Sequence, residues 1–368
     1  MDRLSHLYFE QGQSPWLDNL KRSYLTDGTL AELVRHGIRG LTSNPTIFQK
    51  AIQGSADYDD QFRELVRAGG STIDHYWELV LRDIHGALDA FSALYHDAYR
   101  ADGFVSVEVD PGLAHDGPGT EAAARALHER IGRPNLMVKI PGTEAGLPAI
   151  RQMFAEGRNV NVTLIFSLDR YQKVMDAYID GLEQYAETVD ADLATVASVA
   201  SFFISRVDSE VDARLDAIGT PAALALKGKA AIAQAKLAYQ SFRRTFSGPR
   251  GEALAADGAV VQRPLWASTS TKNPAYPDTL YVDQLIGPDS VNTLPDATIH
   301  AFADHGTVAR TIDTDVAEAE ALWAALAEVG VDMDDVAAKL EREGVASFQA
   351  SFDELLAALA TKAAELGR

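Results

Sequence analysis

Apolar runs with the length of β-strands recur along the chain, and each is followed by a stretch with helical spacing. Segments such as EAAARALHERIG and LDRYQKVMDAYIDGLEQYAE are typical of the helical stretches. Regular alternation of strands and helices favours a parallel sheet, and eight repeats predict an α/β fold of the (β/α)8 TIM-barrel type. The eight predicted strands lie at residues 14–18, 37–44, 104–110, 136–142, 160–166, 196–203, 263–268 and 290–295.

Two intervals between predicted strands are longer than one helix requires. Residues 45–103 and 204–262 each hold more than one helical stretch, and residues 307–368 form an Ala- and Glu-rich helical tail. No proline- or glycine-rich linker separates a second domain. The sequence therefore predicts one barrel domain over 1–368, with two helical insertions and C-terminal helices.

Polar residues share one face of three predicted strands, opposite an aliphatic face. An aliphatic face suits contact with the outer helices, so the polar face is expected to point into the barrel. Asp18 and Asn44 also fall at the ends of their strands, where barrel active sites are built. The inward-facing set is Glu108, Lys139, Asn161 and Thr163.

A lysine inside a barrel indicates either chemistry or a structural ion pair. Desolvation disfavours the ammonium form, and the neutral amine is the nucleophile that forms a Schiff base with a carbonyl. From periodicity alone, a structural pair between Lys139 and Glu108 is slightly favoured. The other polar residues that share the inward-facing side of these strands favour a catalytic site.

Composition removes several classes of function. The 368 residues include 33 basic and 53 acidic side chains, a formal charge of −20, and no cysteine. Such a chain lacks the basic footprint of a nucleic-acid-binding protein, and it can form neither disulfides nor thiolate metal sites. The nine histidines show no paired ligand spacing, so no metal is predicted. Neither a signal peptide nor a membrane span is visible, and a cytoplasmic location is expected.

Long motifs between residues 11 and 306 resemble those of the transaldolases, particularly the bacterial branch of about this length. They include GLTSNPTIFQKAI, GFVSVEVDPGLAHD, PNLMVKIPGTEAGLPAI and NVNVTLIFSLDRY. The resemblance implies transfer of a dihydroxyacetone unit from sedoheptulose 7-phosphate to glyceraldehyde 3-phosphate through a lysine Schiff base. The products would be erythrose 4-phosphate and fructose 6-phosphate, within the pentose phosphate pathway and without a metal or organic cofactor.

The resemblance also assigns a role to each residue in the reaction. Lys139 would attack the ketose C2 carbonyl, and Asp18 would take the proton of the C4 hydroxyl. Glu108 would move protons through a water molecule held by Thr163. The dihydroxyacetone unit would be bound by Asn44, Asn161 and Ser201.

The phosphate site departs from the usual family pattern. Arg206, just after the sixth predicted strand, matches the phosphate arginine, and a guanidinium offers two donors to phosphate oxygens. In many transaldolases the seventh strand ends in Ser-Phe-Arg, whereas this chain reads STSTK over 268–272. Ser268 is retained, and Lys272 is predicted to replace the second cation. Together with Lys139, these cations should make the mouth locally positive despite the net charge.

Each of these residues also has a simpler structural interpretation. Asp18 could cap the next helix, and Asn44 before Pro45 is a turn signal. Thr163 could reflect strand propensity, while Arg206 and Lys272 could be solvated surface charges. Their occurrence together within the family motifs favours function.

Two other functions stay open at this point. One is a lyase like the shorter fructose-6-phosphate aldolases, which release free dihydroxyacetone and usually have Gln at the position of Glu108. The other is a non-catalytic sugar-phosphate binder, against which Lys139 argues. Expected partners are sugar phosphates, with no nucleic acid or membrane, and the protein is expected to be a monomer or homodimer.

Overall fold

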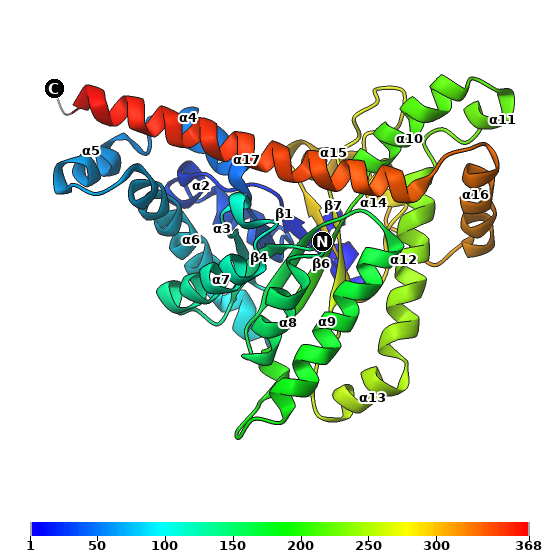
Figure 1. Ribbon diagram of the computed structural model, residues 1–368, viewed down its shortest axis with the longest axis horizontal. Helices are drawn as coiled ribbons and strands as arrows, with labels where there is room; N and C mark the ends of the chain where they lie inside the picture. Colours follow the sequence, from blue (N-terminus) through cyan, green and yellow to red (C-terminus); the bar gives the residue numbers. More distant parts are fainter. Residues whose placement is uncertain (1, 367–368) are drawn as a thin grey trace.

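The computed structural model describes residues 2–366 and contains a closed barrel of eight parallel strands in chain order (Figure 1). The predicted TIM barrel is confirmed. Residue 1 of the predicted domain and residues 367–368 of the predicted tail lie outside the described residues. The strands are β1 (Gln13–Leu17), β2 (Gly40–Thr42), β3 (Phe104–Glu108), β4 (Leu136–Pro141), β5 (Val160–Ile165), β6 (Ser198–Phe203), β7 (Arg263–Ala267) and β8 (Ser290–Leu294).

Strand β2 is shorter than the predicted 37–44. Arg39 bonds through its amide to Pro15 O before the strand begins, and Asn44 already caps the following helix. Extended pairing therefore ends at Thr42, because the chain must turn into the helix at Pro45.

Helices surround the barrel, and extra helices occupy the long intervals. Asp116 and Ser167 cap α7 and α9 by accepting hydrogen bonds from Gly119 N and Arg170 N. The helices up to β5 are α1 (Arg3–Gln11), α2 (Arg22–Thr26), α3 (Thr29–Arg35), α4 (Pro45–Gln53), α5 (Asp59–Ala68), α6 (Thr72–Asp97), the 3-10 turn η1 (Pro111–Leu113), α7 (Gly117–Ile131) and α8 (Leu147–Ala155). The later ones are α9 (Leu168–Ala186), η2 (Leu193–Thr195), α10 (Ser205–Ile218), α11 (Pro221–Leu224), α12 (Ala230–Phe246), α13 (Pro249–Ala256), α14 (Leu280–Asp283), α15 (Asp296–His305), α16 (Val316–Glu328) and α17 (Met333–Leu366).

Strand register places the predicted polar residues side by side. Lys139 on β4 is the lateral neighbour of Glu108 on β3 and of Asn161 on β5. Because neighbouring strands lie about 4.8 Å apart, side chains at these paired positions are in contact range within the barrel. The fold thus brings Lys139 next to Glu108, which lies 31 residues earlier in the chain, and next to Asn161, which lies 22 residues later.

The amino-terminal end of the barrel is closed by a buried ionic network around Asp102. This carboxylate accepts hydrogen bonds from Arg39 Nε at 2.7 Å, Arg263 at 3.2 Å and Ser14 Oγ at 2.7 Å. Removing one partner of such a buried pair costs about 3–5 kcal/mol, so this end is built for stability.

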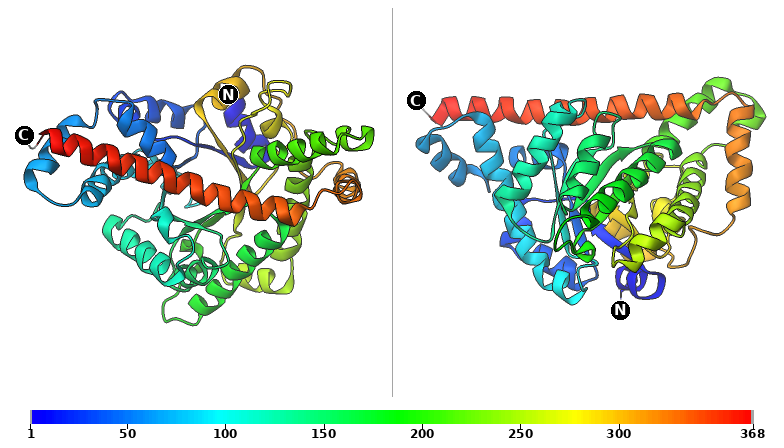
Figure 2. Two further views of the ribbon diagram at one scale, coloured as in Figure 1. Left: turned by 45° about the horizontal axis from the view of Figure 1, so that its top comes forward. Right: turned by 60° about the horizontal axis from the view of Figure 1, so that its bottom comes forward.

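The final helix, α17, lies across the opposite end of the barrel. Figure 2 shows it running over the strands from above α10 toward α5, with α1 on the far side. It is fastened near its middle and near its first turns. Ser351 Oγ shares a 2.8 Å hydrogen bond with Thr46 of α4, and Lys339 pairs with Glu210 of α10 at 2.5 Å. The tail predicted from composition is therefore a wall of the barrel mouth.

No helix within residues 2–366 combines the length and apolarity needed to cross a membrane.

Two glycines with positive φ allow backbone strain and steric clash to be separated. At Gly103 (φ +84°) an added Cβ would lie 2.5 Å from Tyr95 N, whereas at Gly258 (φ +93°) it would meet nothing within 4 Å. We expect Gly258→Ala to lower the free energy of unfolding by roughly 1–2 kcal/mol, the left-handed penalty alone. Gly103→Ala should cost about 3 kcal/mol or more, because α6 backbone must also move. Urea unfolding of both variants measures the difference, and equal losses would contradict the clash.

Candidate active site

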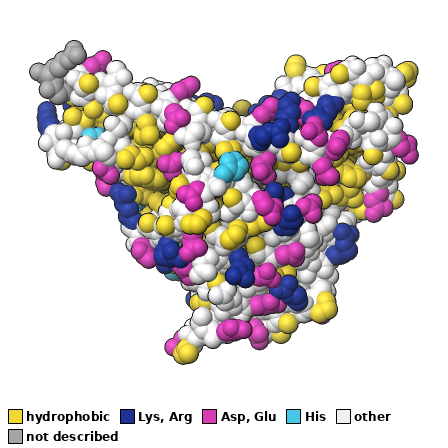
Figure 3. Space-filling model, viewed as in Figure 1, with side chains coloured by type: hydrophobic (Ala, Val, Ile, Leu, Met, Phe, Trp, Pro, Cys, Tyr) yellow, Lys and Arg dark blue, Asp and Glu magenta, His cyan; other side chains and the backbone are white. Residues whose placement is uncertain are grey.

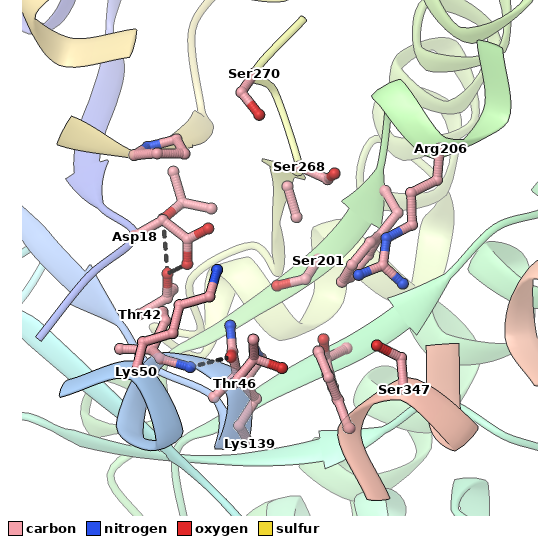
Figure 4. A pocket seen from close by; sticks show the side chains of 18 of the residues that line it. Asp18, Thr42, Thr46, Lys50, Lys139, Ser201, Arg206, Ser268, Ser270 and Ser347 are labelled. Atoms are coloured by element: carbon pink, nitrogen blue, oxygen red, sulfur yellow. Dashed lines mark hydrogen bonds between the residues drawn. The ribbon is translucent and has the colours of Figure 1, made fainter. Parts of the chain in front are cut away.

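A cavity of about 370 Å³ opens at the carboxyl end of the strands, beneath α17. Figure 4 shows Asp18, Thr42 and Lys50 on one side of it, Arg206 and Ser347 on the other, and Lys139 between them. Every predicted site residue lines this cavity except Glu108 and Asn161, which lie behind its wall. The structure therefore gathers most of the predicted set at one place.

Lys139 is buried at the centre of the site, with 4% of its surface exposed. Its Nζ donates to the carbonyl oxygen of Ser43 at 3.3 Å and lies 3.3 Å from Glu108 Oε2. The Phe348 ring of α17 is centred 5.8 Å away on a further side. The predicted Lys139–Glu108 pair is thus present. Lys139 lines the cavity, whereas Glu108 lies behind it and does not.

Two carboxyl groups near Lys139 are shifted toward the protonated form. Burial raises the pKa of Glu108 and of Asp18 above their ordinary values, although the charge of Lys139 acts in the opposite direction on both. Asp18 accepts a hydrogen bond from Thr42 Oγ1 at 2.8 Å, and the residue in the cap position of α2 is Lys21. The simple capping interpretation of Asp18 is therefore wrong.

Strand β5 is irregular where it supplies Thr163. Its pairing with β6 shifts register between Val162 and Ile165, and Leu164 has φ +60°. Left-handed backbone at a non-glycine residue costs of order 1–3 kcal/mol and clusters at functional sites. The buried hydroxyl of Thr163 and both carboxylate oxygens of Glu108 receive no well-aligned hydrogen bond from the described residues. These atoms can therefore form hydrogen bonds with a small polar molecule such as water.

The predicted amide and hydroxyl residues occupy two layers. Asn44 caps α4 by accepting from Ile47 N at 3.0 Å, and it also lines the cavity. Asn161 lies deeper, fully buried, where it donates to Ser106 Oγ at 3.0 Å and accepts from Ser201 Oγ at 2.7 Å. Ser201 lines the cavity, and its hydroxyl group is oriented by the hydrogen bond that it donates to Asn161.

Three cations line the cavity in addition to Lys139. Lys50, Arg206 and Lys272 line it, and none has a carboxylate within 4 Å among the described residues. Burial lowers the pKa of Arg206, and burial together with the charge of Arg206 lowers that of Lys272. Ser268, with φ +56°, directly follows β7, lines the cavity and shares a 3.0 Å hydrogen bond with Ser205.

Acidic and basic side chains are interspersed on the face of the molecule seen in Figure 3. Many charged side chains form ion pairs with one another, such as Arg250 with Glu183 and Arg125 with Glu156. The net charge of −20 therefore does not prevent a local excess of unpaired cations in the cavity.

Comparison with known proteins identifies the family. Residues 15–359 match the family described as Transaldolase/Fructose-6-phosphate aldolase. The chain belongs to this transaldolase family. It is 54% identical over 347 residues to a protein named Transaldolase from Parafrankia sp. (strain EAN1pec), covering 94% of each chain. A transaldolase of Frankia alni is 52% identical over 359 residues, 97% of this chain and 96% of the relative. One from Mycolicibacterium smegmatis is 48% identical over 347 residues, 94% of this chain and 93% of the relative. The resemblance found in the motifs is confirmed.

The structure adds cavity residues to the transaldolase motifs that the sequence did not indicate. Thr46 and Lys50 follow Asn44 on α4, and their position one and two turns past a strand end could have suggested them. Ser347 and Phe348 come from α17, about 200 residues after Lys139, and no periodicity connects the two. Within residues 2–366, no three His, Asp or Glu side chains cluster closely enough to hold a metal ion.

Asp18→Asn tests the electrostatic cost of the site in this transaldolase-family chain. Because the pKa of Asp18 is raised on folding, ionisation weakens the folded state as pH rises above the ordinary value of 3.8. We expect Asp18→Asn to be more stable than the parent protein at pH 7, with a gain that shrinks toward pH 4. Urea unfolding at several pH values measures it. A variant less stable than the parent at pH 7 would contradict the assigned direction.

Proposed function

We propose that the chain is a transaldolase, a transferase that moves a dihydroxyacetone unit from sedoheptulose 7-phosphate to glyceraldehyde 3-phosphate. The observation that carries the proposal is a buried lysine, Lys139, which lies 3.3 Å from the carboxylate of Glu108 and lines a cavity that also holds Asp18. A lysine amine in its neutral form is the nucleophile that adds to a carbonyl.

Formation of the Schiff base requires protons to move near Lys139. The amine adds to C2 of the ketose to give a carbinolamine, which loses water to give an iminium. Glu108, 3.3 Å from Nζ, and the hydroxyl of Thr163 are suited to hold the water molecule that shuttles these protons. Burial raises the pKa of Glu108, which makes its carboxyl group a stronger proton acceptor than an ordinary glutamate.

Cleavage of the carbon chain follows from the iminium. Asp18 accepts the C4 hydroxyl proton, the C3–C4 bond breaks, and its electron pair moves into the iminium to give an enamine. The aldose, erythrose 4-phosphate, leaves. Glyceraldehyde 3-phosphate then enters, the enamine carbon attacks its aldehyde, and Asp18 returns the proton. Water releases fructose 6-phosphate and restores Lys139. The iminium is the electron sink, so the proposed chemistry uses no metal or organic cofactor.

Substrate binding is assigned by charge and hydrogen-bonding capacity. Asn44 and Ser201, with Asn161 behind Ser201, would hold the hydroxyl groups of the dihydroxyacetone unit. Arg206, Ser268 and Lys272 would hold the phosphate of the donor or acceptor. Operation within the pentose phosphate pathway, a cytoplasmic location, a monomer or homodimer, and the lack of nucleic-acid and membrane partners stay predictions.

Replacing Lys139 tests the covalent step. Borohydride reduction with fructose 6-phosphate should attach a dihydroxyacetone-derived adduct to Lys139, seen by peptide mass mapping. Lys139→Ala should form no adduct and lose at least about 10³-fold in transfer rate, with circular dichroism and cooperative unfolding retained. An adduct on another lysine would overturn the mechanism. Unfolding of Lys139→Ala at room temperature would favour the structural ion pair.

The same assay separates transfer from the two alternatives. Turnover of fructose 6-phosphate should depend on erythrose 4-phosphate as acceptor. Turnover independent of the acceptor would indicate an aldolase-like lyase, and binding without any adduct would indicate a non-catalytic sugar-phosphate binder.

Arg206→Ala tests the phosphate site. Loss of a desolvated guanidinium should raise KM for phosphorylated ketoses by about tenfold or more, with a smaller change in kcat. The matched control is Arg214→Ala on the same helix, because Arg214 pairs with Glu210 and Asp335 outside the cavity. An equal change in KM for both variants would contradict a phosphate role for Arg206.

A further inference from the structure

The C-terminal helix supplies the apolar side of the lysine environment. Phe348 is 4% exposed, lines the cavity, and has its ring centre 5.8 Å from Lys139 Nζ. The other near neighbours of Nζ are polar: Glu108 Oε2 and the Ser43 carbonyl oxygen, each at 3.3 Å. The amine therefore has a polar side and an apolar side.

The Phe348 ring is held in this position by contacts on both sides of it along α17. One turn later, Ser351 shares a hydrogen bond of 2.8 Å with Thr46. One turn earlier, Gly344 lacks a side chain where a Cβ would lie 3.0 Å from the bulged residue Leu164. The helix thus approaches β5 closely, and the ring rests on the cavity as part of a fixed wall.

A transferase that keeps a three-carbon unit on its lysine has to prevent early hydrolysis. After the first aldose leaves, protonation of the enamine at C3 gives an iminium. Water can then add at C2, the C2–N bond breaks with proton transfer to nitrogen, and dihydroxyacetone and free lysine result. This side reaction needs water beside Nζ and C2 at a time when the acceptor is absent. Excluding water by an apolar wall suppresses such hydrolysis of intermediates.

We propose that Phe348 is a specificity-determining residue, whose ring shields the lysine-bound dihydroxyacetone unit from bulk water and so favours transfer over hydrolytic release. The inference rests on the proposed transaldolase function and extends it. In this proposal, the water molecule that serves Schiff-base formation lies between Lys139 and the Glu108–Thr163 side of the cavity. Water is excluded from the side that α17 covers.

The test compares two phenylalanines of the same helix. Phe348→Ala and Phe352→Ala each remove a buried ring from α17, but Phe352 does not line the cavity. Each variant is incubated with fructose 6-phosphate and erythrose 4-phosphate, and free dihydroxyacetone and sedoheptulose 7-phosphate are quantified in the same reaction. We expect the ratio of dihydroxyacetone to sedoheptulose 7-phosphate to rise about tenfold or more in Phe348→Ala and to change little in Phe352→Ala. Phe348→Leu, which retains apolar bulk, should lie between Phe348→Ala and the parent protein, and it serves if the alanine variant does not fold.

The outcomes distinguish the two levels of the proposal. An unchanged ratio in Phe348→Ala and Phe348→Leu, or an equal rise in Phe352→Ala, would overturn the role of Phe348 while leaving transaldolase activity intact. A parent protein that neither transfers nor forms the borohydride-trapped adduct on Lys139 would instead overturn the proposed function, and this inference with it.

Discussion

The site depends on keeping an amine and a carboxyl group together inside a barrel. Lys139 and Glu108 occupy paired positions on neighbouring strands, both nearly excluded from solvent, with 3.3 Å between nitrogen and oxygen. Burying either group alone would be costly, and burying both is tolerated because each offsets the charge of the other. Strand register, the inward phase of β3 and β4, and the Ser43 carbonyl are all arranged around this requirement.

Carboxyl groups and cations share the mouth of the barrel. Burial raises the pKa values of Glu108 and Asp18, while Lys50, Arg206 and Lys272 line the same cavity with no carboxylate within 4 Å among the described residues. The charges of Arg206 and Lys272 act on Asp18 in the direction opposite to burial, so the groups proposed for proton transfer and for anion binding influence one another. The stability of the barrel is supplied elsewhere, through the network of Asp102, Arg39 and Arg263 at the amino-terminal end.

Much of this arrangement could be predicted from the sequence, because strand periodicity fixes which side chains share a face. The inward positions of Glu108, Lys139 and Thr163 follow from alternation alone, and a strand-end rule places Asp18 and Asn44. The depth of Asn161 could not be predicted, since it depends on hydrogen bonds to Ser106 and Ser201 from other strands. The bulge at Leu164 leaves no sequence signal, because leucine has no preference for left-handed backbone. Phe348 could not be placed either, since its docking is a tertiary contact made by a helix whose composition predicts only solubility.

The position of α17 in the chain has a consequence for how the site is made. Domains form from the amino-terminal end during synthesis, at about 5–20 residues per second. All eight strands precede residue 295, so the barrel and its lysine can assemble before the last helix is available. Because α17 follows every strand in the chain, the wall bearing Phe348 is synthesised after the barrel strands. Closure of the barrel and completion of the cavity can therefore be separate steps during synthesis.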